Sequence, residues 1–184
     1  MPRFHHGFAR LRSAACNTLL GLGCWLAVGS AQAQSSAHEE VARLLRAGLA
    51  EQAQQKAEAG LATHPNDAQL RFLKGVAQSQ SGQSEAASAT FSALTQDFPE
   101  LPEPYNNLAV LEAAAGRLDA ARAALETALR LNPGYATAQQ NLGDVYARLA
   151  GRAWARALEL DPANPALQPR LQILQQLPTT GAAR

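Results

Sequence analysis

The pattern of apolar positions between Glu100 and Pro133 predicts two helices joined by a turn. Apolar residues recur at intervals of three and four on both sides of Gly116, a spacing that places them on one face of an α-helix. Gly116 marks the turn and Pro133 the end, because glycine adopts the left-handed backbone that closes a helix and proline cannot continue one. These apolar positions are Tyr105, Leu108, Ala109 and Leu111 before the turn, and Ala121, Leu125, Ala128 and Leu129 after it.

The landmarks of this segment recur along the chain every 34 residues. The sets that keep this interval are Gly48, Gly82 and Gly116; Pro65, Pro99 and Pro133; Ala53, Ala87 and Ala121; and the small residues Gly75, Ala109 and Gly143. We expect the small residues to let the two helices of a unit approach closely. A single helical pair cannot bury its apolar face, so about three stacked units are needed.

The period and these landmarks resemble the tetratricopeptide repeat (TPR) family. The resemblance implies an all-α fold, a right-handed superhelical solenoid of helix-turn-helix repeats. Residues 100–133 form the repeat with most matches, and residues 66–99 form the one before it, with Lys74 and Gln78 where the family has large apolar residues. Residues 34–65 form a degenerate first repeat, in which Glu40 and Gly60 depart from the pattern.

The fourth repeat, residues 134–162, is shortened. Pro162 follows Pro133 by 29 residues, so five residues are missing near positions 147–151, where the turn belongs. Two alternatives remain: one fused helix from about Tyr135 to Leu160, which helix propensity favours, or a shortened hairpin that turns at Gly151. Counted back from Pro162, residues of the second-helix type are Trp154, Ala157, Leu158 and Leu160.

A capping helix is expected over residues 163–177, followed by a tail at 178–184. Asn164 followed by Pro165 has the form of an N-cap and a first helical residue. The apolar face of this helix comprises Leu167, Leu171, Ile173 and Leu174.

Residues 1–33 have the composition of a secretory signal peptide. Arg3, Arg10 and Arg12 precede an apolar run from Ala14 to Val28, and the small-x-small pattern at 31–33 predicts cleavage after Ala33. The apolar run is shorter than the roughly 20 residues that span a bilayer, so we expect only transient contact with the membrane. The predicted location is the periplasm of a bacterial envelope.

Removal of this segment changes the chemistry that is available. Both cysteines, Cys16 and Cys24, lie within it, so the remaining chain has no thiol for a disulfide, a nucleophile or a metal site. The loss of three arginines from 16 basic residues, against 15 acidic residues, leaves a net charge of −2. A nearly neutral chain argues against nucleic acid or an anionic membrane as the partner.

Catalytic patterns are not found. His38 lacks the second histidine of a zinc-protease helix, and His64 precedes a proline that ends a repeat. The carboxylates are dispersed among arginines, as on solvated helix faces. We therefore expect no enzymatic activity, no cofactor and no bound metal.

The resemblance to the TPR family implies that first helices line a concave groove that binds a protein or an extended peptide. The positions that would face the groove are Leu45, Arg46, Gln69, Phe72, Val76, Gln80, Glu103, Asn106, Asn107, Val110, Gln140, Asn141 and Asp144. Asn107 and Asn141 lie one period apart, and their amides can both donate to and accept from a peptide backbone, although packing is an alternative role. Family members that hold chaperone carboxylates use lysines and an arginine at such positions, whereas this groove offers Phe72, Asn106 and Gln140.

The sequence thus favours a non-catalytic periplasmic adaptor that binds envelope proteins. The alternative is a structural subunit of an envelope assembly that associates with copies of itself.

Overall fold

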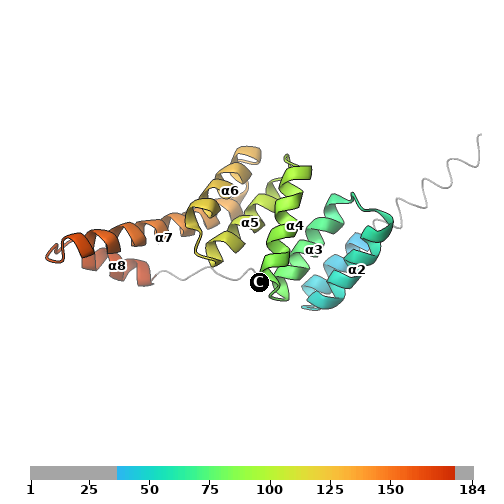
Figure 1. The fold of residues 1–184 in the computed structure, drawn as a ribbon, viewed down its shortest axis with the longest axis horizontal. Coiled ribbons are helices and arrows are strands. Elements are labelled where there is room, and N and C mark those ends of the chain that lie inside the picture. Colours follow the sequence, from blue (N-terminus) through green and yellow to red (C-terminus); the bar gives the residue numbers. More distant parts are fainter. Residues whose placement is uncertain (1–36, 177–184) are drawn as a thin grey trace, which may run out of the picture. The chain divides into compact units, whose positions relative to one another are not determined.

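The structure is a computed structural model that describes residues 37–176, and this part of the chain is helical without strands (Figure 1). The predictions of a signal peptide, of cleavage after Ala33 and of a tail at 178–184 lie outside the described residues. The helices are an N-terminal helix at residues 37–46, α2 Ala50–Thr63, α3 Ala68–Gln80, α4 Ser84–Asp97, α5 Pro102–Ala114, α6 Leu118–Leu131, α7 Ala136–Leu160 and α8 Leu167–Gln176.

Each helix packs on the next along the chain, from α2 against α3 through to α7 against α8. In addition α5 contacts α7, so the first helices of neighbouring repeats also meet. This is the arrangement of stacked helical hairpins, and the predicted all-α TPR solenoid is confirmed. Within residues 37–176, no helix is both long and apolar enough to cross a membrane.

The turns inside the first three repeats share one backbone conformation. Gly48, Gly82 and Gly116 have φ of 72°, 77° and 80°. This left-handed conformation is strained for residues with a Cβ, which explains the recurrence of glycine at this place. The second helices then end two residues before Pro65, Pro99 and Pro133.

Three apolar clusters lie where successive repeats meet. Val41, Leu44 and Leu45 of the N-terminal helix pack with residues of α2 and α3. The second cluster joins α4 to α5 and consists of Ala87, Phe91, Leu94 and Leu111. The third joins α5, α6 and α7 and consists of Ala109, Leu118, Ala121, Leu125, Ala128, Ala138, Leu142 and Val145.

Two glycines permit close contact between helices. A Cβ at Gly75 would lie 2.7 Å from the Phe91 ring, so this small residue has the predicted role. A Cβ at Gly60 would lie 2.6 Å from the Leu70 side chain, which is almost fully buried. Gly60, which the sequence interpretation took as a sign of degeneracy, therefore makes room for Leu70.

Of the two alternatives for the fourth repeat, the structure has the single long helix, the 25-residue α7. Its buried residues, Ala138, Leu142 and Val145, all lie in its first half. The predicted close approach at Gly143 is wrong, because a Cβ at this position would meet nothing within 4 Å. The physical reason is that the fused helix carries the second-helix residues away from Gly143.

The capping helix begins later than predicted, at Leu167, and Pro165 lies in a turn before it. The Asn164 side chain accepts a hydrogen bond from the backbone N–H of Ala166 at 3.1 Å, and its backbone carbonyl accepts one from Leu167. These two bonds close a tight turn, so the helix starts only after it. Leu167 is buried, but Ile173 is 60% exposed and is not part of the buried face predicted for it.

Candidate peptide-binding groove

The candidate residues come from the first helix of each repeat, which are the N-terminal helix, α3, α5 and the first half of α7. Residues three and four apart share one face of a helix. On α3, α5 and α7 the candidates therefore lie along one stripe, whereas Leu45 and Arg46 of the N-terminal helix are adjacent and point in different directions.

In the first two repeats the candidates divide between surface and core. Arg46, Gln69 and Gln80 are exposed, whereas Leu45 is buried in the first apolar cluster. Phe72 and Val76 are half-buried and pack against the cluster that contains Phe91. The Phe72 and Phe91 rings are tilted by 54° with their centroids 5.7 Å apart, so the Phe72 ring packs against Phe91 of α4.

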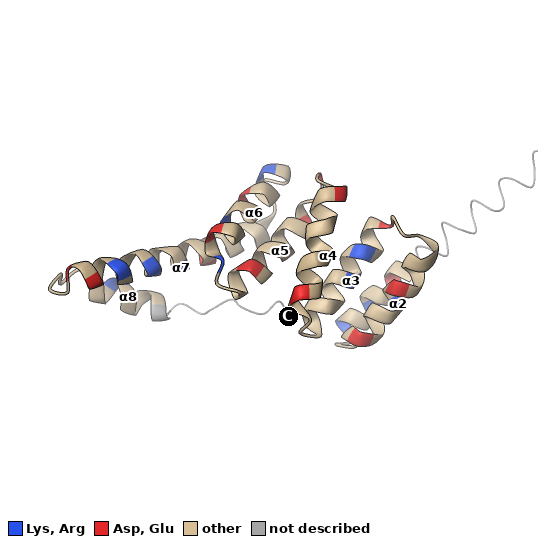
Figure 2. Cartoon of the chain, viewed as in Figure 1, with Lys and Arg blue, Asp and Glu red and all other residues tan. Residues whose placement is uncertain are grey.

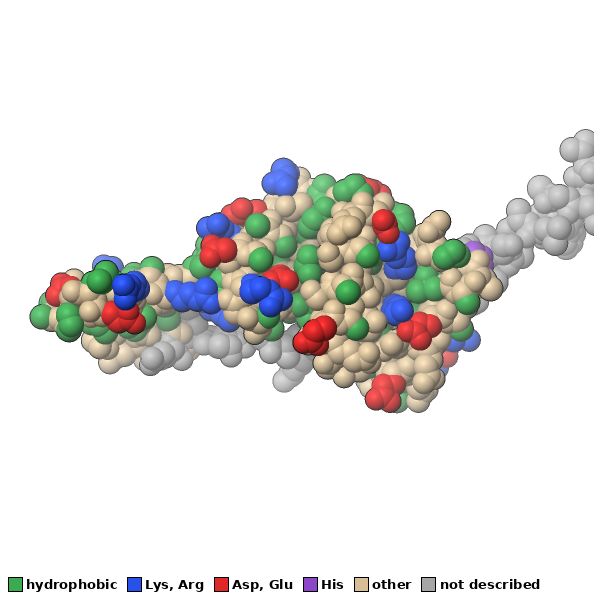
Figure 3. Space-filling view, in the orientation of Figure 1, with side chains coloured by type: hydrophobic (Ala, Val, Ile, Leu, Met, Phe, Trp, Pro, Cys, Tyr) green, Lys and Arg blue, Asp and Glu red, His purple; other side chains and the backbone are tan. Residues whose placement is uncertain are grey.

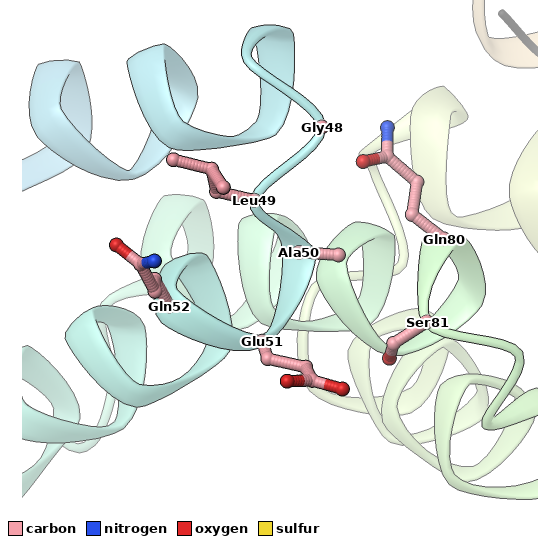
Figure 4. A pocket seen from close by; sticks show the side chains of 7 residues that line it. All are labelled: Gly48, Leu49, Ala50, Glu51, Gln52, Gln80 and Ser81. Atoms are coloured by element: carbon pink, nitrogen blue, oxygen red, sulfur yellow. The ribbon is translucent and has the colours of Figure 1, made fainter.

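A shallow hollow of about 260 Å³ lies where the turn before α2 meets the end of α3 (Figure 4). Gln80 lies at its edge beside Ser81. The remaining lining residues are Gly48, Leu49, Ala50, Glu51 and Gln52. This hollow is smaller than a typical ligand pocket, so it could hold one side chain of a larger partner.

In the middle of the stack, two candidate asparagines bind each other. The side-chain amide of Asn141 in α7 donates a hydrogen bond to the side-chain oxygen Oδ1 of Asn106 in α5 at 2.8 Å. Asn106 is only 5% exposed. The pair therefore joins the first helices of two repeats. Asn106 is buried in this packing contact and is not free to face a ligand in the groove.

Beside this pair, α5 offers a polar and an apolar contact. The Asn107 amide donates to the Glu103 carbonyl oxygen at 2.9 Å within the same helix. Val110, by contrast, is 36% exposed. Burial raises the pKa of the Tyr135 hydroxyl, and the negative charge of Glu103 raises it further.

Gln140 and Asp144 complete the set on α7. Gln140 is exposed, whereas Asp144 is half-buried. The Asp144 Oδ2 atom is buried and has no hydrogen-bond partner in the described part of the chain. A buried acceptor without a partner is unfavourable by about 1–3 kcal/mol, so a donor from outside would be stabilising here.

One side-chain contact between repeats was not expected from the sequence. His38 Nε2 lies 2.8 Å from Asp67 Oδ2, and the Asp67 side chain also accepts from the Leu70 backbone N–H at 3.0 Å. Burial alone would raise the pKa of Asp67, but the hydrogen bonds from Leu70 and His38 hold it below its usual value. An aspartate directly before a helix is the signal that could have revealed this N-cap.

Acidic and basic residues are spread along the helices (Figure 2), and some of them form ion pairs between helices. Lys74 pairs with Glu58 at 3.1 Å and Arg71 with Asp97 at 2.7 Å. On the face that Figure 3 shows, apolar side chains lie among these charges, over α4 and α5 and at the end of α7. Among residues 37–176, no group of three or more His, Cys, Asp or Glu lies close enough to hold a metal ion.

Residues 111–149 match the family described as TPR repeat. The chain is also similar to the chloroplastic TPR domain-containing protein PYG7 of Arabidopsis thaliana, with 38% identity over 84 residues. That alignment covers 43% of this chain and 28% of the relative, so the similarity concerns a minor part of the relative.

Solved structures show the same fold at low identity. PilF of Pseudomonas aeruginosa has a TM-score of 0.61 at 19% identity, over 79% of this chain and 69% of that one. A TPR protein of Thermus thermophilus has 0.58 at 24%, over 76% and 80%. The second TPR domain of human RPAP3, solved in complex with an HSP70 peptide, has 0.56 at 20%, over 60% and 92%.

The 34-residue period and the three left-handed glycine turns give the described residues the tetratricopeptide-repeat fold, and residues 111–149 match the family model itself.

Proposed function

We propose that this protein is a non-catalytic adaptor of the bacterial periplasm that binds an envelope protein through an extended peptide along its first helices. TPR folds are protein- and peptide-binding scaffolds and are generally non-catalytic. The periplasmic setting rests on the signal-peptide composition of residues 1–33. The kind of peptide rests on the candidate groove residues.

The observation that carries the proposal is the unpaired Asp144 Oδ2 atom, one helical turn from Asn141 of the asparagine pair. An extended peptide presents backbone N–H groups at regular intervals, and one of them could donate to this carboxylate. The exposed Val110 offers an apolar contact on α5, which packs against α7. A peptide that combines backbone donors with apolar side chains fits this surface.

The charge of the candidate residues argues against a terminal carboxylate as the anchor. Arg46 is the one cation in the set, whereas Glu103 and Asp144 are acidic. The HSP70 peptide bound by the RPAP3 domain is therefore a guide to the class of ligand, a peptide, and not to its sequence.

Site-specific crosslinking in the producing cell tests the groove. A photoreactive residue at Val110 should give a discrete adduct with one envelope protein. Leu131 is the matched control, since it is an apolar residue of similar exposure, 40% against 36%, but lies on a second helix. An adduct at Leu131 without one at Val110 would contradict the groove.

Asp144→Ala then tests the ligand contact. Because a hydrogen bond to a charged group contributes about 1.5–3 kcal/mol, affinity for the captured partner should fall roughly tenfold or more. Affinity is measured by titration with the purified partner. Cell fractionation and N-terminal sequencing test the location, with Gln34 expected as the first residue of a periplasmic protein.

A further inference from the structure

The long helix α7 contains the residues of two repeat helices in one rod. Aligned on the repeat-ending prolines, Ala150, Trp154 and Ala157 correspond to Ala121, Leu125 and Ala128 of α6. The sequence of a second helix is thus retained, although the turn that would fold it back is missing.

The first half of α7 leaves open the surface that a second helix covers in other repeats. Gly143 corresponds to Gly75, where a Cβ would lie 2.7 Å from Phe91, yet a Cβ at Gly143 meets nothing within 4 Å. Tyr146 is 48% exposed, whereas its counterpart Gln78 is 6% exposed. The Tyr146 hydroxyl donates to Glu126 of α6 at 3.3 Å.

The second half of α7 is incompletely covered as well. Trp154 is half-buried, whereas Phe91 and Leu125 at the same repeat position are fully buried. α8 packs on one side of this half: Arg170 lies 5.7 Å from the Trp154 ring centre, and a Cβ at Gly151 would lie 3.2 Å from Leu174. Figure 1 shows α8 beside the far half of α7, beyond the end of α6.

Two complementary halves of one interface are therefore incompletely covered on the same helix, with Gly143 exposed and Trp154 half-buried. Gly143 and Trp154 are 11 residues apart, which separates them by about 16 Å along the axis. A continuous helix cannot bring them together. A second α7 that runs antiparallel can, because it places its Trp154 at Gly143 and receives the first Trp154 at its own Gly143.

We propose that two copies of this chain form a symmetric dimer in which the two α7 helices pack antiparallel, with the two-fold axis near Arg148 and Leu149. Each copy then supplies the missing second helix of the other copy's fourth repeat, with α8 attached as its cap. Such a reciprocal contact is isologous and closes on itself. Deletion of hinge residues is a known route to domain exchange, and here the five-residue deletion has this effect.

The occupant is a second copy because its sequence already has the required register. The stripe Gly143, Tyr146, Ala150, Trp154 and Ala157 is spaced by three, four, four and three residues, so it lies on one face of α7. A helix from an unrelated protein would need the same spacing of small and aromatic residues to fit this stripe, and a second copy of α7 already has it.

Restoration of the turn is the decisive test. A copy of residues 114–118, AAGRL, inserted between Ala147 and Arg148 restores the interval of 34 residues and puts glycine at the left-handed position. The full chain should have twice the monomer mass by light scattering or sedimentation equilibrium. The variant with the insertion should be a monomer, since its own second half can now fold back on Gly143.

A substitution pair tests the contact without a change of chain length. Gly143→Leu should give a monomer, because leucine occupies the place of the second Trp154 while helix propensity is improved. Ala155→Leu, a small-to-large change at an exposed position on another side of α7, should remain a dimer. Circular dichroism verifies that each variant is folded.

Two results would overturn the proposal. One is an unmodified chain that stays monomeric at every concentration tested, and the other is a dimer that persists in both the insertion variant and Gly143→Leu. Neither result tests the proposed groove, because the crosslinking residue Val110 lies on α5 and not on α7.

Discussion

At the scale of the residue, one repeat position shows how packing decides what each side chain can be. Gly75, Ala109 and Gly143 share this position, yet they face a phenylalanine, a leucine-containing cluster and open space. The sequence pattern treats them as equivalent small residues. Their surroundings make them different.

Gly75→Ala should destabilise the fold by about 1–3 kcal/mol, because the added methyl group would overlap the buried Phe91 ring. Urea unfolding measures the loss. Phe91→Leu reproduces the alanine–leucine combination of the third repeat, Ala109 with Leu125. The double variant should therefore be more stable than the sum of the two single changes predicts. Simple additivity would show that the two positions do not interact.

At the scale of the element, helix ends depend on local bonds that join distant parts of the chain. Asp67 is the N-cap of α3 and also holds His38 of the N-terminal helix, 29 residues away. One carboxylate therefore both starts a helix and ties the first repeat to the second.

Asp67 should make stability depend on pH in the acid range. Its pKa is lower in the folded protein than the usual 3.8, so the carboxylate contributes stability above pH 3.8 that is lost as the pH falls through the folded value. Asp67→Asn keeps a good cap and should lose this part of the acid dependence. Asp67→Ala should cost about 1 kcal/mol at neutral pH as well. Unfolding curves at several pH values measure both effects, and identical acid limbs in wild type and Asp67→Asn would exclude the role.

At the scale of the described domain, buried residues are distributed unevenly along the stack. The three apolar clusters extend from the N-terminal helix to the first half of α7. Beyond Val145, the buried apolar residue of the described chain is Leu167. In a linear stack each repeat is stabilised by its neighbours, so this end has the least support.

Hydrogen exchange should reveal this gradient. At protein concentrations where the chain is monomeric, amides after Gly151 in α7 and those in α8 should exchange before amides of α3 to α6. Mass spectrometry of peptic fragments measures the order. A uniform exchange rate over residues 37–176 would mean that the whole stack opens as one unit.

Much of the fold could be predicted because its signals are local and periodic. The glycine turns, the ends of the second helices and the fused fourth repeat depend on backbone preferences that act within a few residues. The candidate groove was less predictable. Asn106 and Leu45 are buried, and the Asp144 acceptor is unpaired, because these properties depend on neighbours from other repeats.

The sequence by itself determined the period, the helical class and the missing turn, since 34-residue spacing and glycine and proline positions are properties of the chain alone. Tertiary structure decided that Gly60 accommodates Leu70, that His38 meets Asp67, and that Gly143 faces open space. The physical reason is that burial and pairing arise between residues far apart in sequence, and they follow only when the helices have been placed side by side.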